Sequence, residues 1–473
     1  MGNEKSSNTG LRAPIVTVLG HVDHGKTTLL DAFRETSVQL KEAGGITQGI
    51  GASVLTTKDG SRITFVDTPG HAAFANMRSR GARIADIAIL VVAADDGVKP
   101  QTKEALSYIL EAKIPYIVAA TKMDLPSASS LIVKSQLEKE SVLFEGGGGD
   151  VPLVEISAKT KKGLNELLEM ITLIAELNGI KGDKSANLEA VIIETVKDKR
   201  GPLASAVVRN GALKIADNIV TETVAAKVRG LFDYLGKSVR EVGPGEPVQI
   251  MGFSVLPEVG SKVWKKGEKE ILPQKLYQRK KIVEVSSGEI PVTIKADNAG
   301  ALEAIIANIP EGIQVVEFGV GEVNETDVFM AKSSGASHIL AFETKAAGSV
   351  AKLAETEGVA VESFEIIYKL FERLEELVAQ SKDEILGQAK ILTSFPFNNN
   401  KVAGCKVLAG VIGRNDKLVL TREEEKVGEI KAVSLKREKQ NIDRAKAGEE
   451  FGILFTPQLD FRVGDVISSV RRK

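Results

Sequence analysis

The sequence predicts a multidomain protein of mixed α/β and β class: an α/β domain, a β-barrel, a small α/β/α domain, a long connecting helix and a C-terminal β-barrel, in that order. Three observations support this prediction. The chain has 473 residues, more than one compact domain usually contains. Strand-like apolar runs alternate with helical patterns in two separate regions, and a short pattern of glycine and aspartate occurs twice.

Changes in the hydrophobic pattern set the expected boundaries. A charged, glycine-containing stretch, NGIKGDKSAN, separates the first α/β domain from the barrel that follows it. The expected parts are a flexible N-terminal tail at 1–12, an α/β domain at 13–180, a β-barrel at 181–272, a small α/β/α domain at 273–364, a connecting helix at 365–387 and a C-terminal β-barrel at 388–473.

The first α/β domain has strand-like runs such as IVTVLG, IAILVVAA and IPYIVAAT between helical segments such as PQTKEALSYILEA. This alternation predicts a parallel sheet with helices on both faces. A smaller set of strands and helices starts at IPVTIKADNAGALEAIIANI. It leads into IIYKLFERLEELVAQSKDEIL, whose apolar residues have helical spacing and predict the connecting helix.

The two barrels are predicted from an internal repeat. GALKIADNIV, starting at Gly211, aligns with GVIGRNDKLV, starting at Gly410, and each copy has an aspartate, Asp217 or Asp416, at the same spacing. A second match follows in each copy, GEPVQIMGF and GEEFGILF. Short strands separated by Gly and Asn/Asp turns are typical of small barrels, so two copies of one barrel module are the simplest explanation.

Composition restricts the class of protein. Cys405 is the single cysteine, which excludes an intramolecular disulfide framework and favours a cytoplasmic location. No apolar run approaches the roughly 18 residues of a membrane-spanning helix, and the first residues have no signal-peptide pattern. With a net charge of −1, any nucleic-acid binding must use local patches.

A phosphate-binding loop is predicted at GHVDHGKT, which has the form G-x-x-x-x-G-K-[ST] between a strand and a helix. Its glycines let backbone N–H groups point at phosphate, Lys26 reaches the β- and γ-phosphates, and Thr27 places a hydroxyl on Mg²⁺. The expected nucleotide-binding residues of this loop are Gly20, His21, Val22, Asp23, His24, Gly25, Lys26, Thr27 and Thr28.

Guanine is the base that the sequence favours. TKMD and SAK each follow a predicted strand, in the order expected after a phosphate-binding loop. The Asp124 carboxylate can accept two hydrogen bonds from the guanine edge, a donor pattern that adenine lacks, while the Lys122 stem packs along the base. The expected base-site residues are Thr121, Lys122, Asp124, Ser157, Ala158 and Lys159, and the expected cofactors are GTP or GDP with Mg²⁺.

Two further stretches predict a nucleotide-dependent switch. EAGGITQGIGAS is rich in glycine, and Thr47 within it is placed to give Mg²⁺ a second hydroxyl. The turn Asp67–Gly70 has the phosphate-sensing form D-x-x-G, and His71 follows it directly. Its imidazole could orient the water that attacks a phosphoryl group; the alternative is a solvent-facing histidine at a helix start. His338, in the small domain, is expected to be structural.

These motifs, with FVDTPGHAAFANMRSRGARIADIAILVVAADDGVKPQTKEAL, SLKR and GEEFGI, resemble the bacterial translation initiation factor two family over nearly the whole chain from Arg12. The resemblance implies a P-loop GTPase domain and a ribosome-stimulated GTPase. Such a factor brings formylmethionyl initiator tRNA to the small ribosomal subunit and promotes joining of the large one. We expect a monomer whose partners include ribosomal RNA and no membrane.

The resemblance also implies roles for single residues. His71 would be the catalytic residue that positions water, and Val22 with Ile46 would form an apolar gate that keeps it away until the sarcin-ricin RNA loop of the ribosome engages. Gly70 would detect the γ-phosphate through its backbone, and Asp67 would hold Mg²⁺ through water. The small α/β/α domain would relay the nucleotide state to the terminal barrel.

In the terminal barrel, the resemblance implies a site for the formylmethionyl end of the tRNA. A small apolar pocket with a few polar groups suits a thioether side chain and a blocked amine, and two neighbouring cations suit the terminal phosphates. The matching positions are Cys405, Lys436, Arg437, Glu450 and Phe451.

The chain departs from the family pattern at Thr121, Gly49 and Phe451, where the family usually has Asn, His and Cys. Two other functions stay open. One is another translational GTPase, such as an elongation factor, although elongation factors carry consecutive barrels after the GTPase domain. The other is a nucleotide-gated binding protein with negligible hydrolysis, in which His71 has no catalytic role.

Overall fold

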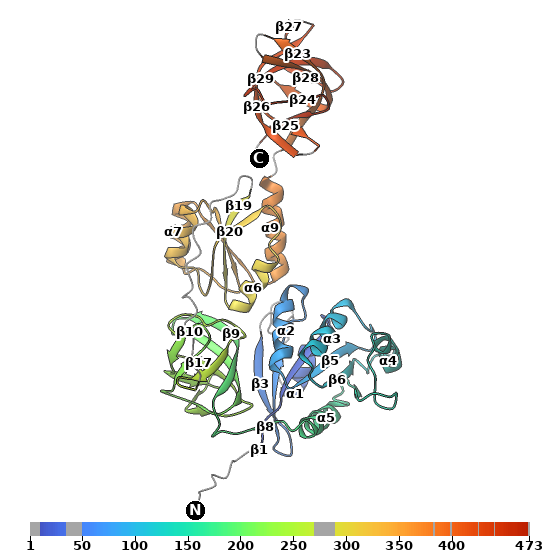
Figure 1. Ribbon diagram of the computed structural model, residues 1–473, viewed down its shortest axis with the longest axis vertical. Helices are drawn as coiled ribbons and strands as arrows, with labels where there is room; N and C mark the ends of the chain where they lie inside the picture. The colour runs from blue at the N-terminus through green and yellow to red at the C-terminus, as the bar shows by residue number, and fades with distance from the viewer. Residues whose placement is uncertain are drawn as a thin grey trace, which may run out of the picture. The chain divides into compact units, whose positions relative to one another are not determined.

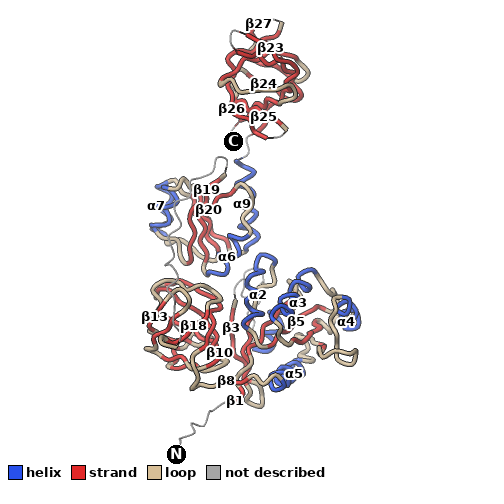
Figure 2. Tube along the Cα trace, viewed as in Figure 1, coloured by secondary structure: helices blue, strands red, loops and turns tan. Residues whose placement is uncertain are grey.

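The computed structural model describes residues 10–34, 50–268, 289–381, 384–397, 400–423, 425–438 and 440–471. The chain forms two compact units, Met1–Phe371 and Glu372–Lys473. Figure 2 shows the helices gathered in two α/β domains, while both barrels consist of strands and loops in the residues that it colours. In the part of the chain described, no helix has both the length and the apolar character needed to cross a membrane.

The first domain contains a six-stranded sheet with helices on both faces (Figure 1). The predicted parallel pairing is confirmed for β4, β2, β5, β6 and β7, whereas the edge strand β3 pairs antiparallel with β4. In spatial order the strands are β3 (Gly51–Thr56), β4 (Arg62–Asp67), β2 (Ile15–Gly20), β5 (Ile87–Ala93), β6 (Tyr116–Thr121) and β7 (Leu153–Glu155).

In the described part of this domain there are five α-helices: α1 (Lys26–Arg34), α2 (Ala75–Ile84), α3 (Pro100–Ala112), α4 (Ser130–Lys139) and α5 (Leu164–Leu177). Helices α1 and α5 contribute to one hydrophobic core, and α2, α3 and α4 contribute to the core on the other face. Every residue of β2 and β5 is buried, as expected for strands covered on both faces. The carboxyl ends of the parallel strands therefore share one edge, where a ligand can reach the loops.

The first barrel is built around the antiparallel pair β9 (Glu189–Asp198) and β10 (Gly201–Asn210). The sheet order is β13-β12-β18-β9-β10-β17-β14-β15, and β11 pairs with β16. The remaining strands are β11 (Leu213–Lys214), β12 (Asn218–Val220), β13 (Ala225–Lys227), β14 (Gly230–Phe232), β15 (Ser238–Val239), β16 (Glu241–Val242), β17 (Pro247–Met251) and β18 (Lys262–Lys265).

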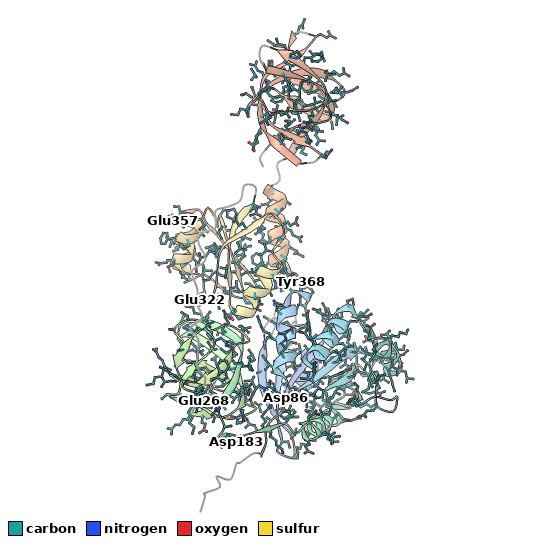
Figure 3. The ribbon with its side chains drawn as sticks, in the orientation of Figure 1. Asp86, Asp183, Glu268, Glu322, Glu357 and Tyr368 are labelled. Carbon is teal, nitrogen blue, oxygen red and sulfur yellow. The ribbon has the colours of Figure 1, made fainter. Side chains whose placement is uncertain are left out.

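The prediction of a flexible tail at 1–12 is wrong for the last residues of that range. Strand β1 (Gly10–Leu11) pairs with β8 (Lys181–Gly182), so this part of the tail is held in a sheet. Arg12 forms a bidentate ion pair with Asp86, in which Nη1 and Nη2 donate to Oδ2 and Oδ1 at 2.6 and 2.8 Å. Nη2 of Arg209, in the first barrel, lies 3.3 Å from Oδ1 of the same carboxylate. Asp86, labelled in Figure 3, thus joins the tail, the first domain and the barrel.

The small domain has the predicted alternation of strands and helices. Its parallel sheet has the order β20-β19-β21-β22. The elements are β19 (Ile290–Ala296), α6 (Ala299–Ala307), β20 (Ile313–Val320), α7 (Glu325–Ser333), β21 (His338–Phe342), α8 (Gly348–Glu357) and β22 (Ala360–Phe364). Its predicted start, at residue 273, lies outside the described residues.

The connecting helix α9 (Ile367–Ser381) is shorter than the predicted 365–387. The prediction was wrong at the C-terminal end because β23 (Glu384–Phe397) begins there and pairs with both β24 and β30. A Cβ atom on Gly387 would lie 2.3 Å from the backbone oxygen of Val411, so this glycine allows two strands to approach closely. The terminal barrel therefore starts earlier than residue 388.

The terminal barrel is closed, because β24 pairs back with β23 at the other end of the strand order. Closure leaves no unpaired sheet edge along these strands. In order around the barrel the strands are β23, β30 (Val466–Arg471), β25 (Lys417–Arg422), β26 (Glu425–Arg437), β29 (Glu450–Thr456) and β24 (Asn400–Gly413), with β27 (Gln440–Asn441) and β28 (Arg444–Lys446) attached.

The internal repeat is confirmed by matching turns in the two barrels. Gly211 and Gly410 have nearly the same left-handed φ, 70° and 69°. Asp217 accepts a hydrogen bond from a backbone N–H at 2.9 Å, and Asp416 accepts the equivalent bond at 2.7 Å. The same turn chemistry thus fixes the same corner in both barrels.

Candidate functional site: a nucleotide pocket and its histidine

The predicted phosphate-binding loop connects β2 to α1 at the carboxyl edge of the sheet. A Cβ atom on Gly20 would lie 2.4 Å from the backbone oxygen of Val91, and the φ of this residue is 151°. Gly25 also has a positive φ, 90°. Glycine at both positions lets the loop pass close to β5 and turn its backbone toward a ligand.

Lys26 is buried in this loop. Its Nζ donates hydrogen bonds to the backbone oxygens of Gly20, at 3.1 Å, and His21, at 2.5 Å. Burial lowers the pKa of Lys26 to about 8, although the nearby Asp67 opposes that change. A buried ammonium group gains stability from an added anion, so the loop fits a phosphate group.

Gly70, in the phosphate-sensing turn, lies directly against the phosphate-binding loop. A Cβ atom on Gly70 would be 2.5 Å from Lys26 Nζ and 3.3 Å from Val22 Cα. The backbone N–H of Val22 in turn donates to Gln101 Oε1 on α3, at 3.1 Å. The structure therefore brings three of the predicted residues together, and a side chain at Gly70 would displace the Lys26 ammonium group or the turn.

The residues expected to hold Mg²⁺ are only partly described. Thr47, together with Ile46 and Gly49, lies outside the described residues. Thr27 lies in the first turn of α1, and Asp67 ends β4 close enough to affect the pKa of Lys26. Among the residues the structure describes, no group of three or more His, Cys, Asp or Glu could hold a metal ion. Mg²⁺ bound to nucleotide needs few protein ligands, so one hydroxyl and one carboxylate fit it.

The two base-site motifs meet at the ends of β6 and β7. Ser157 Oγ donates to Asp124 Oδ1 at 2.8 Å and accepts from the backbone N–H of Thr160 at 3.1 Å. The bond from Ser157 is the main reason why the pKa of Asp124 lies below its usual value. Lys122 Nζ lies 3.7 Å from Asp95 Oδ1. Asp124 is thus a charged, oriented acceptor, as guanine recognition requires.

Thr121 connects the base site to the phosphate-binding loop. Its side chain is buried, and its Oγ1 donates to the backbone oxygen of His24 at 2.6 Å. A longer bond of 3.4 Å reaches the backbone oxygen of Val92. The hydroxyl at this position therefore fixes the spacing between two parts of one pocket.

The side chain of His24 turns away from the loop. Its Nδ1 accepts from the backbone N–H of Ala93 at 3.2 Å, and its Nε2 lies 3.3 Å from Asp96 Oδ2. Burial is the main cause that lowers its pKa to about 4, so the imidazole is neutral at pH 7. Any contact of His24 with phosphate would therefore use its backbone. The ring of His21 packs edge-on against it, with centroids 4.9 Å apart.

His71 starts the short helix η2 (Ala72–Phe74), as one of the two sequence interpretations expected. The expectation that such a residue faces solvent is wrong, because His71 is only 8% exposed. Its Nδ1 accepts from the backbone N–H of Ala73 at 2.8 Å. Its Nε2 is buried and has no hydrogen-bond partner among the described residues. Burial, and then the charge of Arg78, lowers the pKa of the ring, which is therefore neutral.

Two aromatic rings cover His71. The Tyr368 ring lies 4.1 Å from the imidazole, centroid to centroid, and the Phe74 ring lies 5.8 Å away in an edge contact. Tyr368, labelled in Figure 3, belongs to the first turn of α9. One local signal could have pointed to this residue: an aromatic side chain on the polar side of an amphipathic helix.

Arg78 supports the same turn from the inside and was not predicted. Its side chain is buried, and Nη1 donates to the backbone oxygens of Pro69 and His71, the former at 3.3 Å. Nη2 donates to Glu104 Oε2 on α3 at 2.9 Å. No motif marks this arginine, because its partners are backbone atoms and a distant helix.

The expected tRNA-binding positions lie on three adjacent strands. Cys405 is in β24, Lys436 and Arg437 end β26, and Glu450 and Phe451 begin β29. Cys405 and Phe451 face each other in register, but they are only 2% and 4% exposed and pack in the barrel core. Lys436 and Arg437 are exposed at the end of β26. Glu450 is also exposed, and it pairs with Lys406 at 3.6 Å. The five positions therefore divide into two buried core residues and three charged residues on the surface.

His338 begins β21 and contacts polar neighbours within the small domain. Its Nδ1 lies 2.9 Å from Ser337 Oγ, and its Nε2 lies 3.7 Å from Glu362 Oε1. These contacts are in keeping with the structural role expected for it.

Comparison with known proteins finds three matching family models. The Elongation factor Tu GTP binding domain matches residues 11–176, Elongation factor G domain 2 matches residues 187–266, and Translation-initiation factor 2 matches residues 265–375. Among solved structures, the GDP-bound aIF5B from Aeropyrum pernix is 27% identical, with a TM-score of 0.46 over 97% of this chain and 92% of that one.

Curated relatives cover nearly the whole chain. The translation initiation factor IF-2 of Halothermothrix orenii is 41% identical over 98% of this chain and 73% of the relative. The corresponding proteins of Nitratiruptor sp. and Aquifex aeolicus are 39% and 38% identical over 97% and 96% of this chain. The chain spans 58% and 60% of the length of these two relatives.

Proposed function

The chain belongs to the translation initiation factor IF-2 family, and we propose that it is a ribosome-stimulated GTPase that delivers formylmethionyl initiator tRNA to the small subunit and promotes subunit joining. The observation that carries this proposal is the nucleotide pocket itself. Lys26 and Gly70 meet where phosphate would bind, and Asp124 is oriented at the base site of the same sheet edge. We further propose that the protein acts as a monomer in the cytoplasm.

The residues of the pocket would have separate roles in GTP binding and hydrolysis. Lys26 offers a buried positive charge to the β- and γ-phosphates, and the backbone of Gly70 lies against it, where it would detect the γ-phosphate. Thr27 and Asp67 would hold Mg²⁺, which when bound neutralises charge on the phosphate oxygens. Asp124 and Ser157 would select guanine.

His71 would position the attacking water. A neutral imidazole can accept a hydrogen bond from water through the nitrogen that the backbone does not use, which here is Nε2. In the structure Nε2 is buried, so catalysis requires His71 to change its conformation. Val22, half of the proposed apolar gate, lies against Gly70, next to this histidine in the chain.

The terminal barrel would bind the initiator tRNA through its charged surface. Lys436 and Arg437 suit the terminal phosphates, and Arg437 already pairs with Glu449 at 2.7 Å. Cys405 and Phe451 lie in the core beneath this surface, so their proposed contact with the formylmethionyl group requires the barrel wall to open there.

The test is GTP turnover with and without ribosomes, for the wild type and His71→Ala. The wild type should be stimulated by ribosomes, and His71→Ala should lose most of the stimulated rate while still binding GTP. A wild type without ribosomal stimulation would overturn the translational function. Binding of formylated and unformylated initiator tRNA, compared for the wild type and a Lys436→Ala, Arg437→Ala variant, tests the terminal barrel separately.

A binding protein with negligible hydrolysis is the second candidate. The buried Nε2 of His71 favours it, since a water cannot reach that atom in the conformation seen. The same turnover experiment decides between the two: equal rates for the wild type and His71→Ala under every condition would support the binding protein.

A further inference from the structure

Phe74 and Tyr368 form an aromatic cover over His71, whose one nitrogen that could hold a water is buried. Nδ1 is already used by the backbone of Ala73, and Nε2 is buried with no hydrogen-bond partner in the described structure. A buried polar nitrogen without a partner is unfavourable in free energy, so something else must hold the ring in this position.

The two parts of the cover differ in how firmly they are held. Phe74 is 1% exposed and belongs to the same turn as His71, so it moves with that turn. Tyr368 is 49% exposed and comes from α9, far along the chain. Tyr368 is therefore the part that can leave without disturbing the core of the first domain.

The phosphate-binding loop also affects Tyr368 electrostatically. Burial is the main cause that raises the pKa of its hydroxyl, and the negative charge of Asp23 raises it further. Asp23 precedes His24 in the loop and has a left-handed φ of 59°. One side chain from α9 thus packs against the ring of His71 and is within the electrostatic influence of the loop expected to hold phosphate.

We propose that Tyr368 is a positioning residue that holds His71 in a covered, inactive conformation, and that stimulated hydrolysis requires Tyr368 to leave the imidazole. This inference rests on the proposed function, because it assigns an inhibitory residue to the same hydrolytic site. It predicts that the aromatic ring of Tyr368, rather than its hydroxyl, is the essential group.

The first test is spectroscopic and needs neither nucleotide nor ribosomes. The chain has four histidines, so the imidazole signals of His71 can be assigned in the full-length, histidine-labelled protein by comparison with His71→Ala. A tyrosine ring 4.1 Å away shifts these signals through its ring current. Tyr368→Ala should remove the shift, and Tyr368→Phe should keep it.

The second test is the rate of GTP hydrolysis without ribosomes. Tyr368→Ala should raise this rate about fivefold, the factor equivalent to about 1 kcal/mol for one aromatic pair. Tyr368→Phe should behave as the wild type. The increase should vanish in the double variant Tyr368→Ala, His71→Ala, because it depends on the released imidazole.

The matched control is Tyr234→Ala, which removes a tyrosine of similar exposure, 45%, from the first barrel. It should change neither the His71 signals nor the rate. His71 signals that are the same in the wild type and Tyr368→Ala overturn the contact. If Tyr368→Ala loses the contact with His71 but its rate of GTP hydrolysis does not rise, the inhibitory role of Tyr368 is overturned. Both outcomes differ from a failure of the proposed function, which would appear as a wild type that ribosomes do not stimulate.

Discussion

Arg78 Nη2 donates to both carboxylate oxygens of Glu104, at 3.1 and 2.9 Å, behind the turn that carries His71. Tyr108 donates to the same carboxylate at 2.6 Å, so the glutamate is held in turn by α3. The other terminal nitrogen of Arg78, Nη1, faces backbone oxygens of residues 69–71. One buried side chain thus fastens the turn that carries His71 to α3.

Arg78→Lys should slow ribosome-stimulated hydrolysis by about tenfold or more. A lysine cannot bond Glu104 and the backbone oxygens together, so the turn shifts, and small displacements of catalytic groups are costly. Steady-state turnover with ribosomes measures the effect. Arg83→Lys is the control on the same helix: its exposed pair with Glu111, 2.8 Å long, should contribute little. Equal losses in both variants would count against the role of Arg78.

Gly70→Ala should weaken GTP binding by about tenfold, while GDP binding changes less. The new Cβ would lie 2.5 Å from Lys26 Nζ and 3.3 Å from Val22 Cα, so the Lys26 ammonium group or the turn must shift from the γ-phosphate position. Titration with fluorescent nucleotides measures both affinities. Gly348→Ala, where a Cβ meets nothing within 4 Å, is the control and should leave both affinities unchanged. A variant that binds GTP as the wild type does would contradict the assignment.

Thr121→Val should lower the affinity for both GTP and GDP by roughly tenfold. The change keeps the shape of the side chain but leaves the backbone oxygen of His24 without its 2.6 Å bond, a cost of about 1–3 kcal/mol. Isothermal titration of each nucleotide measures it. Thr57→Val removes a similar 2.8 Å bond to Ser61 in an exposed turn and should have little effect. If both variants bind alike, Thr121 does not connect the two halves of the pocket.

Glu194 should make the stability of the first barrel depend on pH. It accepts from the backbone N–H groups of Thr195, at 2.8 Å, and Gly300, at 3.2 Å, and burial raises its pKa to about 7. The folded protein therefore binds this proton more tightly than the unfolded chain. The stabilising contribution is complete below the ordinary pKa of 4.5 and is lost as the pH rises through about 7.

Between pH 5 and pH 8 this change amounts to about 3 kcal/mol, which Glu194→Gln should remove. Trp264 is the single tryptophan and lies in β18, beside β9, so its fluorescence in urea follows this barrel. Glu189→Gln, on the same strand but exposed, should keep the pH dependence of the wild type. A Glu194→Gln variant that retains that dependence would show that another group titrates.

Cys405 should react with thiol reagents about a thousandfold more slowly in the folded protein than in the unfolded chain at pH 8. Burial raises the pKa of its thiol to about 12 from 9.0, and the thiolate is the reactive form. A colorimetric thiol assay with and without urea measures both rates. Fast reaction of the folded protein would mean that an open pocket, rather than packed core, surrounds this residue.

Local patterns predicted what depends on neighbouring residues. The phosphate-binding loop, the base-site motifs and the parallel strands follow from spacing within short segments, and the structure has them there. The antiparallel strand β3 was missed because its glycine-rich surroundings favoured a switch segment over a strand. In the terminal barrel, Ala403, Cys405 and Val407 alternate along β24 and are all core residues, although Cys405 was predicted only as part of the tRNA-binding site.

Contacts between distant parts of the chain could not be predicted. Tyr368 meets His71 only because α9 begins beside the first domain, and no pattern within either segment encodes that approach. The same holds for Asp86, which binds Arg12 and Arg209 from two different directions. Such contacts depend on how whole domains pack, which hydrophobic period and motif spacing do not specify.

Because the thiol of Cys405 is buried, the chain can be labelled with a fluorescent dye at a cysteine introduced elsewhere. It is the single cysteine of the sequence, and it is 2% exposed. A cysteine placed at an exposed site such as Tyr234 in the first barrel or Leu408 in the terminal barrel would then be the thiol that a maleimide dye meets. A donor and acceptor at these two sites would measure, by energy transfer, whether the distance between the two labels changes when nucleotide and ribosomes are added.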